Sequence, residues 1–183
     1  RLFKLHPDVD EVAVADLSPD HVAASMKKHA IKRGYASFDE MLDKAPDLDA
    51  IAIFTQRHLH GPMIVKALKA GKHVYSAVPI GCTIEEIEEI IDIVKRTRLI
   101  YMMGETCYYY PCSIYCREKY ASGEMGKFVY GESQYYHDIC EMYDDFKRSG
   151  GAEWRRVAGI PPMFYPTHSI SMIFSAINEH ARK

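Results

Sequence analysis

The chain has 183 residues, of which 48% are apolar, 11% aromatic and 26% charged, and 23 basic against 25 acidic residues leave a formal net charge of -2. This near balance excludes a generally basic protein that coats nucleic acid, and an acidic disordered tail. The apolar content suffices for a packed core, but no stretch reaches the roughly 18–20 apolar residues of a membrane helix. We therefore expect a folded protein of one domain, or of one and part of a second, whose partners are small molecules and copies of itself.

Five cysteines, an odd number in a chain of this size, argue against a disulfide scaffold and favour a reducing, cytoplasmic setting. Three of them lie close in sequence without C-x-x-C spacing, namely Cys107, Cys112 and Cys116. Packed free thiols are therefore favoured over a zinc site, and we predict no metal.

Short β-branched runs alternate with segments of helical period through the first two thirds of the chain. Strands are expected at residues 11–16, 48–54, 73–76 and 99–103. Helices are expected at residues 18–30, from the capping box at 37–40, at 60–70, and from the capping box at 83–86 to about Lys95. Such alternation is typical of an α/β fold with a doubly wound parallel sheet.

After Gly104 the pattern changes. Tyr108, Tyr109 and Tyr110 precede a helix that should run from Pro111 to about residue 122, residues 126–132 alternate as a strand, and helical spacing resumes near residue 169. We place the domain boundary close to Tyr108. The first domain is then residues 1–108, a dinucleotide-binding domain, and residues 109–183 begin an α+β substrate domain.

Asp16 ends the first expected strand, where a dinucleotide-binding fold places the acid that hydrogen-bonds a ribose hydroxyl. The alternative is an acid at a helix start, next to Ser18. The G-x-G-x-x-G fingerprint lies about 20 residues before such an acid, and the chain contains no such motif. We favour a Rossmann-like sheet whose first strand and glycine turn are missing, over an unrelated fold. Because Asp16 would repel a 2′-phosphate, NAD is favoured over NADP.

The loop after the strand at residues 48–54 carries Thr55, Gln56, His58 and His60. His-x-His after a strand occurs in metal-dependent hydrolases, but no second cluster of His and Asp completes such a site. A loop that lines a cofactor crevice is favoured, with Thr55, Gln56 and His60 as candidates, and His60 as an alternative start of the next helix.

The residues resemble the Gfo/Idh/MocA oxidoreductases, and the resemblance covers almost the whole chain. It rests on the segments Asp49–Thr55, His58–His60, Ala70–Val74 and Ser122–Lys127, with Pro79. It implies a nucleotide-binding domain followed by an α+β domain whose open sheet covers the substrate and often forms the interface of a homo-oligomer. It also implies cofactor contacts at Ala77, Val78, Pro79 and Glu105.

Two positions depart from most dehydrogenases of that family. Their Glu-Lys-Pro triplet, with a Lys near the reacting hydroxyl, is here Ala77-Val78-Pro79, and Val78 cannot donate a proton. Their Asp-x-x-x-His pair is also broken, since Phe164 lies four residues before His168. The chain resembles more closely the NAD-dependent α-N-acetylgalactosaminidase branch of the superfamily, which also has Val-Pro here.

That branch implies catalytic roles for Glu105, Tyr135, Tyr165 and His168. Glu105 opens Glu-x-Cys, Tyr135 opens Tyr-x-His-Asp, and residues 165–168 read Tyr-Pro-Thr-His. An imidazole suits proton transfer near neutrality, and Pro166 would make the last motif a rigid turn. Glu105 has the alternative of an ordinary loop acid.

His137 and Tyr109 are substrate-binding candidates. Residues two apart share a strand face, so His137 would point with Tyr135 into one cleft, or both would be surface groups. Tyr109 would stack on a sugar or pack in the core.

Three functions remain open. The first is an NAD(P)-dependent oxidoreductase that moves a hydride from a sugar or sugar derivative. The second is an NAD-dependent glycoside hydrolase that works by transient oxidation, elimination and water addition, outside the usual two-carboxylate scheme. The third is a sugar or nucleotide sensor that has kept the fold without catalysis.

Overall fold

The computed structural model describes residues 3–136, 138, 140, 144, 147 and 166–179. The chain forms two compact units, Arg1–Asp49 and Ala50–Lys183. None of the helices in the described ranges combines the length and the apolar character of a bilayer-spanning segment.

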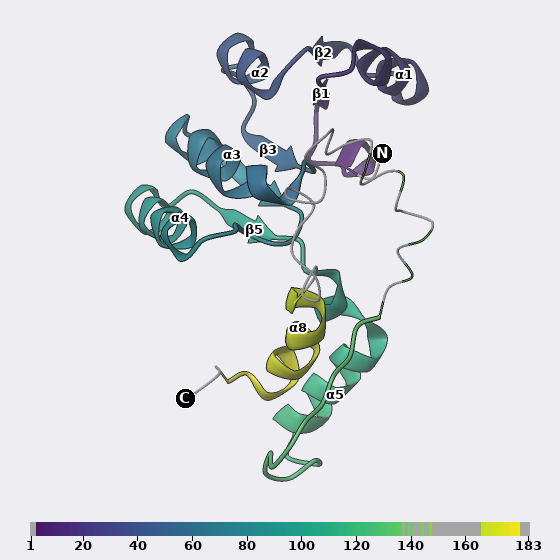
Figure 1. Ribbon diagram of the computed structural model, residues 1–183, viewed down its shortest axis with the longest axis vertical. Coiled ribbons are helices and arrows are strands. Elements are labelled where there is room, and N and C mark those ends of the chain that lie inside the picture. Colours follow the sequence, from purple (N-terminus) through teal and green to yellow (C-terminus); the bar gives the residue numbers. More distant parts are fainter. Residues whose placement is uncertain are drawn as a thin grey trace. The chain divides into compact units, whose positions relative to one another are not determined.

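In the first unit two parallel strands are joined by one helix and followed by another (Figure 1). The elements are η1 Phe3–Leu5, β1 Ala13–Ala15, α1 Pro19–His29, β2 Arg33–Tyr35 and α2 Phe38–Lys44. Ser18 and Ser37 cap α1 and α2 through hydrogen bonds from backbone amides of the first turn, as the sequence predicts. The sequence did not predict β2, because Arg-Gly-Tyr is short and shows no apolar alternation.

The second unit begins with a three-stranded parallel sheet in the order β3-β4-β5. Its elements are β3 Ala50–Ile53, α3 Arg57–Lys69, β4 His73–Ser76, α4 Ile84–Thr97 and β5 Tyr101–Met103. Figure 1 shows α3 and α4 on one face of these strands. Alternate strand residues are buried beneath the helices, and this core contains Ile51, Ile53, Ile64, Leu68, Val74, Ile90 and Ile93.

The described strands form two separate parallel sheets, β1-β2 in the first unit and β3-β4-β5 in the second. All pairings among the described residues are parallel. The predicted class, a Rossmann-like parallel α/β fold, is confirmed. The predicted boundary between domains at residue 108 remains a prediction.

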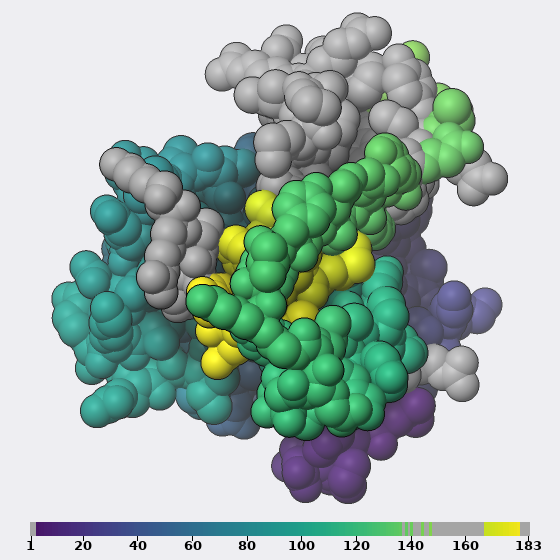
Figure 2. Space-filling view, turned by 90° about the horizontal axis from the view of Figure 1, so that it is seen from below, coloured from purple at the N-terminus to yellow at the C-terminus, as the bar shows by residue number. Residues whose placement is uncertain are grey.

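Beyond β5 the second unit changes character. A short helix η2 (Thr106–Tyr109) leads into α5 (Pro111–Ala121), and α8 (Pro166–Ile177) packs against both. Residues 126–136 lie across α8, where the Ser133 hydroxyl donates a hydrogen bond to the Ser169 carbonyl (Figure 2). The strand predicted at residues 126–132 is wrong for the described part of the chain, because a strand needs a partner and none there pairs with this segment.

Candidate active site

The carboxyl ends of β3, β4 and β5 lie at one edge of the sheet, where open parallel sheets bind ligands. At the end of β5 the chain passes Tyr75 so closely that a Cβ on Gly104 would lie 2.1 Å from the Tyr75 hydroxyl oxygen. Only glycine fits this approach without displacing the tyrosine. Gly104 thereby places Glu105 directly behind the strand end.

Glu105 and His168 form a buried pair. Glu105 Oε1 lies 2.8 Å from His168 Nδ1, and the two side chains are only 8% and 11% exposed. The same oxygen accepts the backbone N–H of Cys107 at 2.9 Å and so caps η2. Because a carboxylate only accepts hydrogen bonds, Nδ1 of His168 carries the hydrogen, as geometry assigns it.

The Glu105 carboxyl is held as an anion despite its burial. Burial by itself would raise its pKa, but hydrogen bonding from His168 and the Cys107 amide, with Thr167 close by, outweighs burial and lowers the pKa below the ordinary 4.5. Neither Glu105 Oε2 nor Thr167 Oγ1 has a partner at hydrogen-bond distance among the described residues. We therefore count Thr167 as an electrostatic neighbour and the two bonds to Oε1 as the hydrogen bonds that matter.

Tyr135 completes the cluster. Its half-buried ring lies with its centroid 4.6 Å from that of His168, at an interplanar angle of 43°. Tyr110 is a further neighbour, and hydrogen bonding with Cys107 raises the pKa of its phenol. A carboxylate, an imidazole and a phenol from three separate segments are thus brought together, which is a set of groups suited to moving protons.

The Cys107 thiol raises a metal alternative. Donor atoms of Glu105, Cys107 and His168 lie within 4.8 Å of one another. A metal would need a thiolate, however, and burial chiefly raises the pKa of Cys107. Glu105 Oε1 is moreover already engaged by two donors. We read the group as a carboxylate–imidazole pair, and the expectation of no metal remains a prediction.

The remaining predicted site residues fall into three groups. Thr55, Gln56, Ala77, Val78 and Pro79 follow β3 and β4 at the ligand edge, and the Val78–Pro79 peptide is cis. Tyr109 is 56% exposed and meets the ring of Tyr108 edge-on at 4.9 Å. His137 and Tyr165 lie outside the described residues.

Two predicted cofactor residues have structural partners. Asp16, in the first unit, accepts the N–H of Ser18 at 2.8 Å, which is its alternative role as a helix-start acid, while its side chain stays 44% exposed. His60 is 1% exposed, and each of its ring nitrogens faces a backbone carbonyl.

Sequence reasoning missed the direct Glu105–His168 bond and the neighbours Cys107, Tyr110 and Thr167. One signal was available for Cys107, because an acid two residues before a helical turn is a typical capping arrangement. The contact with Tyr110 carries no such local pattern.

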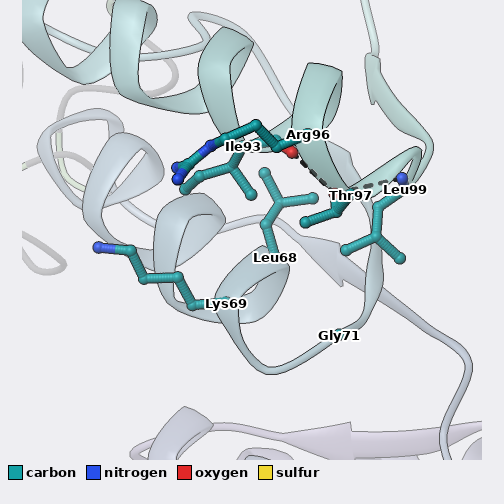
Figure 3. A pocket seen from close by; sticks show the side chains of 7 residues that line it. All are labelled: Leu68, Lys69, Gly71, Ile93, Arg96, Thr97 and Leu99. Atoms are coloured by element: carbon teal, nitrogen blue, oxygen red, sulfur yellow. Dashed lines mark hydrogen bonds between the residues drawn. The ribbon is translucent and has the colours of Figure 1, made fainter.

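Two surface hollows lie away from this cluster. One of about 550 Å³ is formed where α3 and α4 end, and so at the amino edge of the strands (Figure 3). There Thr97 donates to the Ile93 carbonyl and accepts the Leu99 N–H. The other, of about 460 Å³, lies between α5, α8 and residues 125–134. Neither includes Glu105 or His168 among its lining residues.

A parallel α/β sheet with a carboxylate, an imidazole and a phenol beyond its carboxyl edge has the arrangement of a dinucleotide-binding fold. Residues 2–105 match the family profile described as "Oxidoreductase family, NAD-binding Rossmann fold" (GFO_IDH_MocA), so the chain belongs to this family and carries its NAD-binding fold.

Two curated relatives are named α-N-acetylgalactosaminidase. The one from Bacteroides fragilis is 31% identical over 138 residues, 73% of this chain and 32% of that protein. The one from Shewanella oneidensis is 28% identical over 170 residues, 91% of this chain and 37% of that protein. The chain thus spans between 32% and 39% of the length of the first curated relatives it matches.

Among solved structures, myo-inositol 2-dehydrogenase from Lactobacillus plantarum superimposes with a TM-score of 0.79 at 21% identity, over 97% of this chain and 51% of that one. At this identity the likeness concerns the fold.

Proposed function

We propose that the protein containing this chain is an NAD-dependent oxidoreductase that acts on a hydroxyl-bearing carbon of a sugar or sugar derivative. The carrying observation is the buried Glu105–His168 pair directly behind a strand end of an NAD-binding fold. Oxidation of an alcohol removes a proton together with a hydride, so a base must lie beside the hydride acceptor.

The residues at the strand ends fit a dinucleotide. The Gln56 side chain makes no capping hydrogen bond to α3, and the amino end of a helix is a favourable place for an anionic group. Nδ1 of His58 is buried in the same turn without a partner among the described residues. Thr55, Gln56, Ala77, Val78, Pro79 and Glu105 are the proposed contacts. Bound NAD would supply the hydride acceptor.

Asp16 is proposed to select NAD over NADP. Its carboxylate keeps one oxygen on the Ser18 amide and is 44% exposed, so it can still accept from a ribose hydroxyl. A 2′-phosphate would meet repulsion there.

His168 is the proposed base. With Nδ1–H directed at the Glu105 carboxylate, Nε2 is the nitrogen that takes up a proton, and the carboxylate stabilises the imidazolium that results. Glu105 is thus a positioning and charge-stabilising residue. Tyr135, next to the imidazole ring, is the proposed second proton-transfer group.

The substrate-binding residues are proposed from the family resemblance and from their position in the chain. Tyr109 lies four residues after Glu105 in the sequence, and its exposed ring could stack on a sugar. His137 and Tyr165 are proposed as further contacts on the motif that each shares with the galactosaminidase branch.

Glycoside hydrolysis is the second candidate. It is favoured by the two relatives named α-N-acetylgalactosaminidase and by Val78, which occupies the place of the proton-handling Lys. In this scheme bound NAD would take a hydride from the sugar and later return it. Tyr135 or His168 would remove the proton from the neighbouring carbon, so that the glycosidic oxygen can leave and water can add.

One experiment separates the candidates. The whole protein is incubated with NAD and free sugars, and separately with aryl glycosides. Accumulation of NADH supports the dehydrogenase, and aryl release without NADH supports the hydrolase. Binding of sugar or NAD with neither reaction would overturn both and leave the sensor.

The cellular compartment and the oligomeric state are also proposals. The five cysteines are free in the structure, which supports a reducing cytoplasm. The resemblance supports a homo-oligomer with a small sugar ligand, and gel filtration with light scattering tests the assembly. The formal net charge of -2 and the lack of a long apolar stretch are the grounds for proposing no nucleic-acid and no membrane partner.

A further inference from the structure

His60 is a buried histidine for which the proposed chemistry has no use. It lies in the first turn of α3 and is 1% exposed. Its Nδ1 is 2.7 Å from the Pro79 carbonyl oxygen, and its Nε2 is 3.1 Å from the Thr55 carbonyl oxygen. A ring so enclosed is not placed to touch a cofactor directly.

The two carbonyls belong to the loops that leave neighbouring strands. Thr55 follows β3 and Pro79 follows β4. The last paired residues of these two strands are Ile53 and Ser76, and the Ala77 amide donates one further hydrogen bond to the Ile53 carbonyl. One imidazole therefore continues the connection between the strands beyond the end of the sheet. It fixes the spacing of the two loops from which cofactor contacts are expected.

The far end of the second loop is held as well. Glu86, in the capping box of α4, accepts the amides of Cys82 and Thr83 at 2.8 and 3.3 Å. A Cβ on Gly61, the residue after His60, would lie 2.6 Å from the Glu86 carboxyl, so the first turns of α3 and α4 are in close contact. Residues 79–83 are thus held at one end by His60 and at the other by Glu86.

The hydrogen-bond partners of His60 indicate which of its ring nitrogens carries a hydrogen. A carbonyl oxygen only accepts, so each contact requires an N–H on the ring nitrogen. The shorter contact, to Pro79, places a hydrogen on Nδ1, and the bond to Thr55 forms as well when Nε2 carries one. A form protonated at Nε2 alone would leave the Pro79 carbonyl facing a lone pair.

We propose that His60 is a positioning residue for NAD, which sets the spacing of the Thr55 and Pro79 loops without touching the cofactor. This rests on NAD binding at the strand-end edge. Replacement by a ring without N–H groups, His60→Phe, removes the donor that connects the Pro79 and Thr55 carbonyls, and we expect the Kd for NAD to rise about tenfold. His60→Asn retains one donor and should recover part of the affinity.

His73→Ala is the matched control. The Nδ1 of His73, in β4, accepts the N–H of Ile100, the residue before β5, at 2.8 Å, but His73 lies at the amino edge of the same sheet. Its removal should lower the melting temperature without changing the Kd for NAD.

The test measures the Kd for NAD by calorimetry, the melting temperature, and the ¹⁵N resonances of His60 in the whole protein. A proton on Nδ1 and a Kd raised in His60→Phe but not in His73→Ala support the proposal. A hydrogen on Nε2 alone, or equal Kd values in wild type and His60→Phe, would overturn it, and the resonances decide the question even if a variant does not fold. Failure of the unmodified protein to bind NAD would overturn both this role and the cofactor assignment.

Discussion

The β3-β4-β5 sheet and the cluster of Glu105, Tyr135 and His168 lie in the same unit but are built differently. The sheet is local: β3 and β4 are each followed directly by a helix, α3 and α4, and a capping box marks where α4 begins. The cluster joins residues far apart in the chain, since its two hydrogen-bonded partners are separated by 63 positions. Changes in the sheet should therefore alter stability, and changes in the cluster should alter chemistry.

The largest expected effect is in the cluster. His168→Ala should lower kcat by about 10²–10⁴-fold, the contribution typical of a positioned acid–base group. Steady-state kinetics on the whole protein measures it. Ser175→Ala, in the same helix, removes a hydroxyl that donates to the Met172 carbonyl within α8, and this variant should keep its activity. Full turnover by His168→Ala would remove this histidine from the mechanism.

Glu105→Gln should have the second largest effect, a loss of about 10²-fold in kcat, although the glutamine side chain has nearly the same shape as glutamate. An amide can still accept from Nδ1 but cannot stabilise an imidazolium by charge. The same variant without loss of activity would reduce Glu105 to a helix cap.

The pH dependence of stability gives a second readout of Glu105. Because its pKa is lowered in the folded protein, the pairing contributes fully to the free energy of unfolding above the ordinary value of 4.5 and is lost as pH falls through the lower folded pKa. The stability difference between wild type and Glu105→Gln should therefore shrink on acidification below pH 4.5. Urea titrations at a series of pH values measure it, and a difference that grows on acidification would contradict the assignment.

In the sheet, Gly104→Ala should lower the free energy of unfolding by about 1–3 kcal/mol, since the added methyl overlaps the ring of Tyr75. The double variant with Tyr75→Leu should regain part of the loss. Equal stability of Gly104→Ala and wild type in denaturant would mean that the strand end is looser than described.

The smallest expected effect is at a helix cap. Thr83→Ala removes one half of the α4 capping box and should lower stability by about 1 kcal/mol, with unchanged kcat. Thermal unfolding and kinetics on the same samples test both halves of this expectation. A fall in kcat without loss of stability would contradict the separation between sheet and cluster.

The same contrast explains what the sequence could predict. Local patterns predict some of the helices and strands, because each pattern lies within a few residues. Examples are the capping boxes at Ser37 and Thr83 and the apolar runs of β3 and β4. β2 carries no such signal, and residues 126–132 alternate like a strand without a partner in the described chain. Glu105 and His168 were identified by resemblance, but their hydrogen bond depends on how η2 and α8 pack, which local pattern does not encode.

The central claim is that Glu105 acts through His168. It is tested most directly by kcat/KM for wild type, Glu105→Gln, His168→Ala and the double variant in the whole protein. The account predicts that the double variant is no slower than His168→Ala alone, since the carboxylate has nothing left to position. Losses that multiply in the double variant would show two independent groups and would contradict the account.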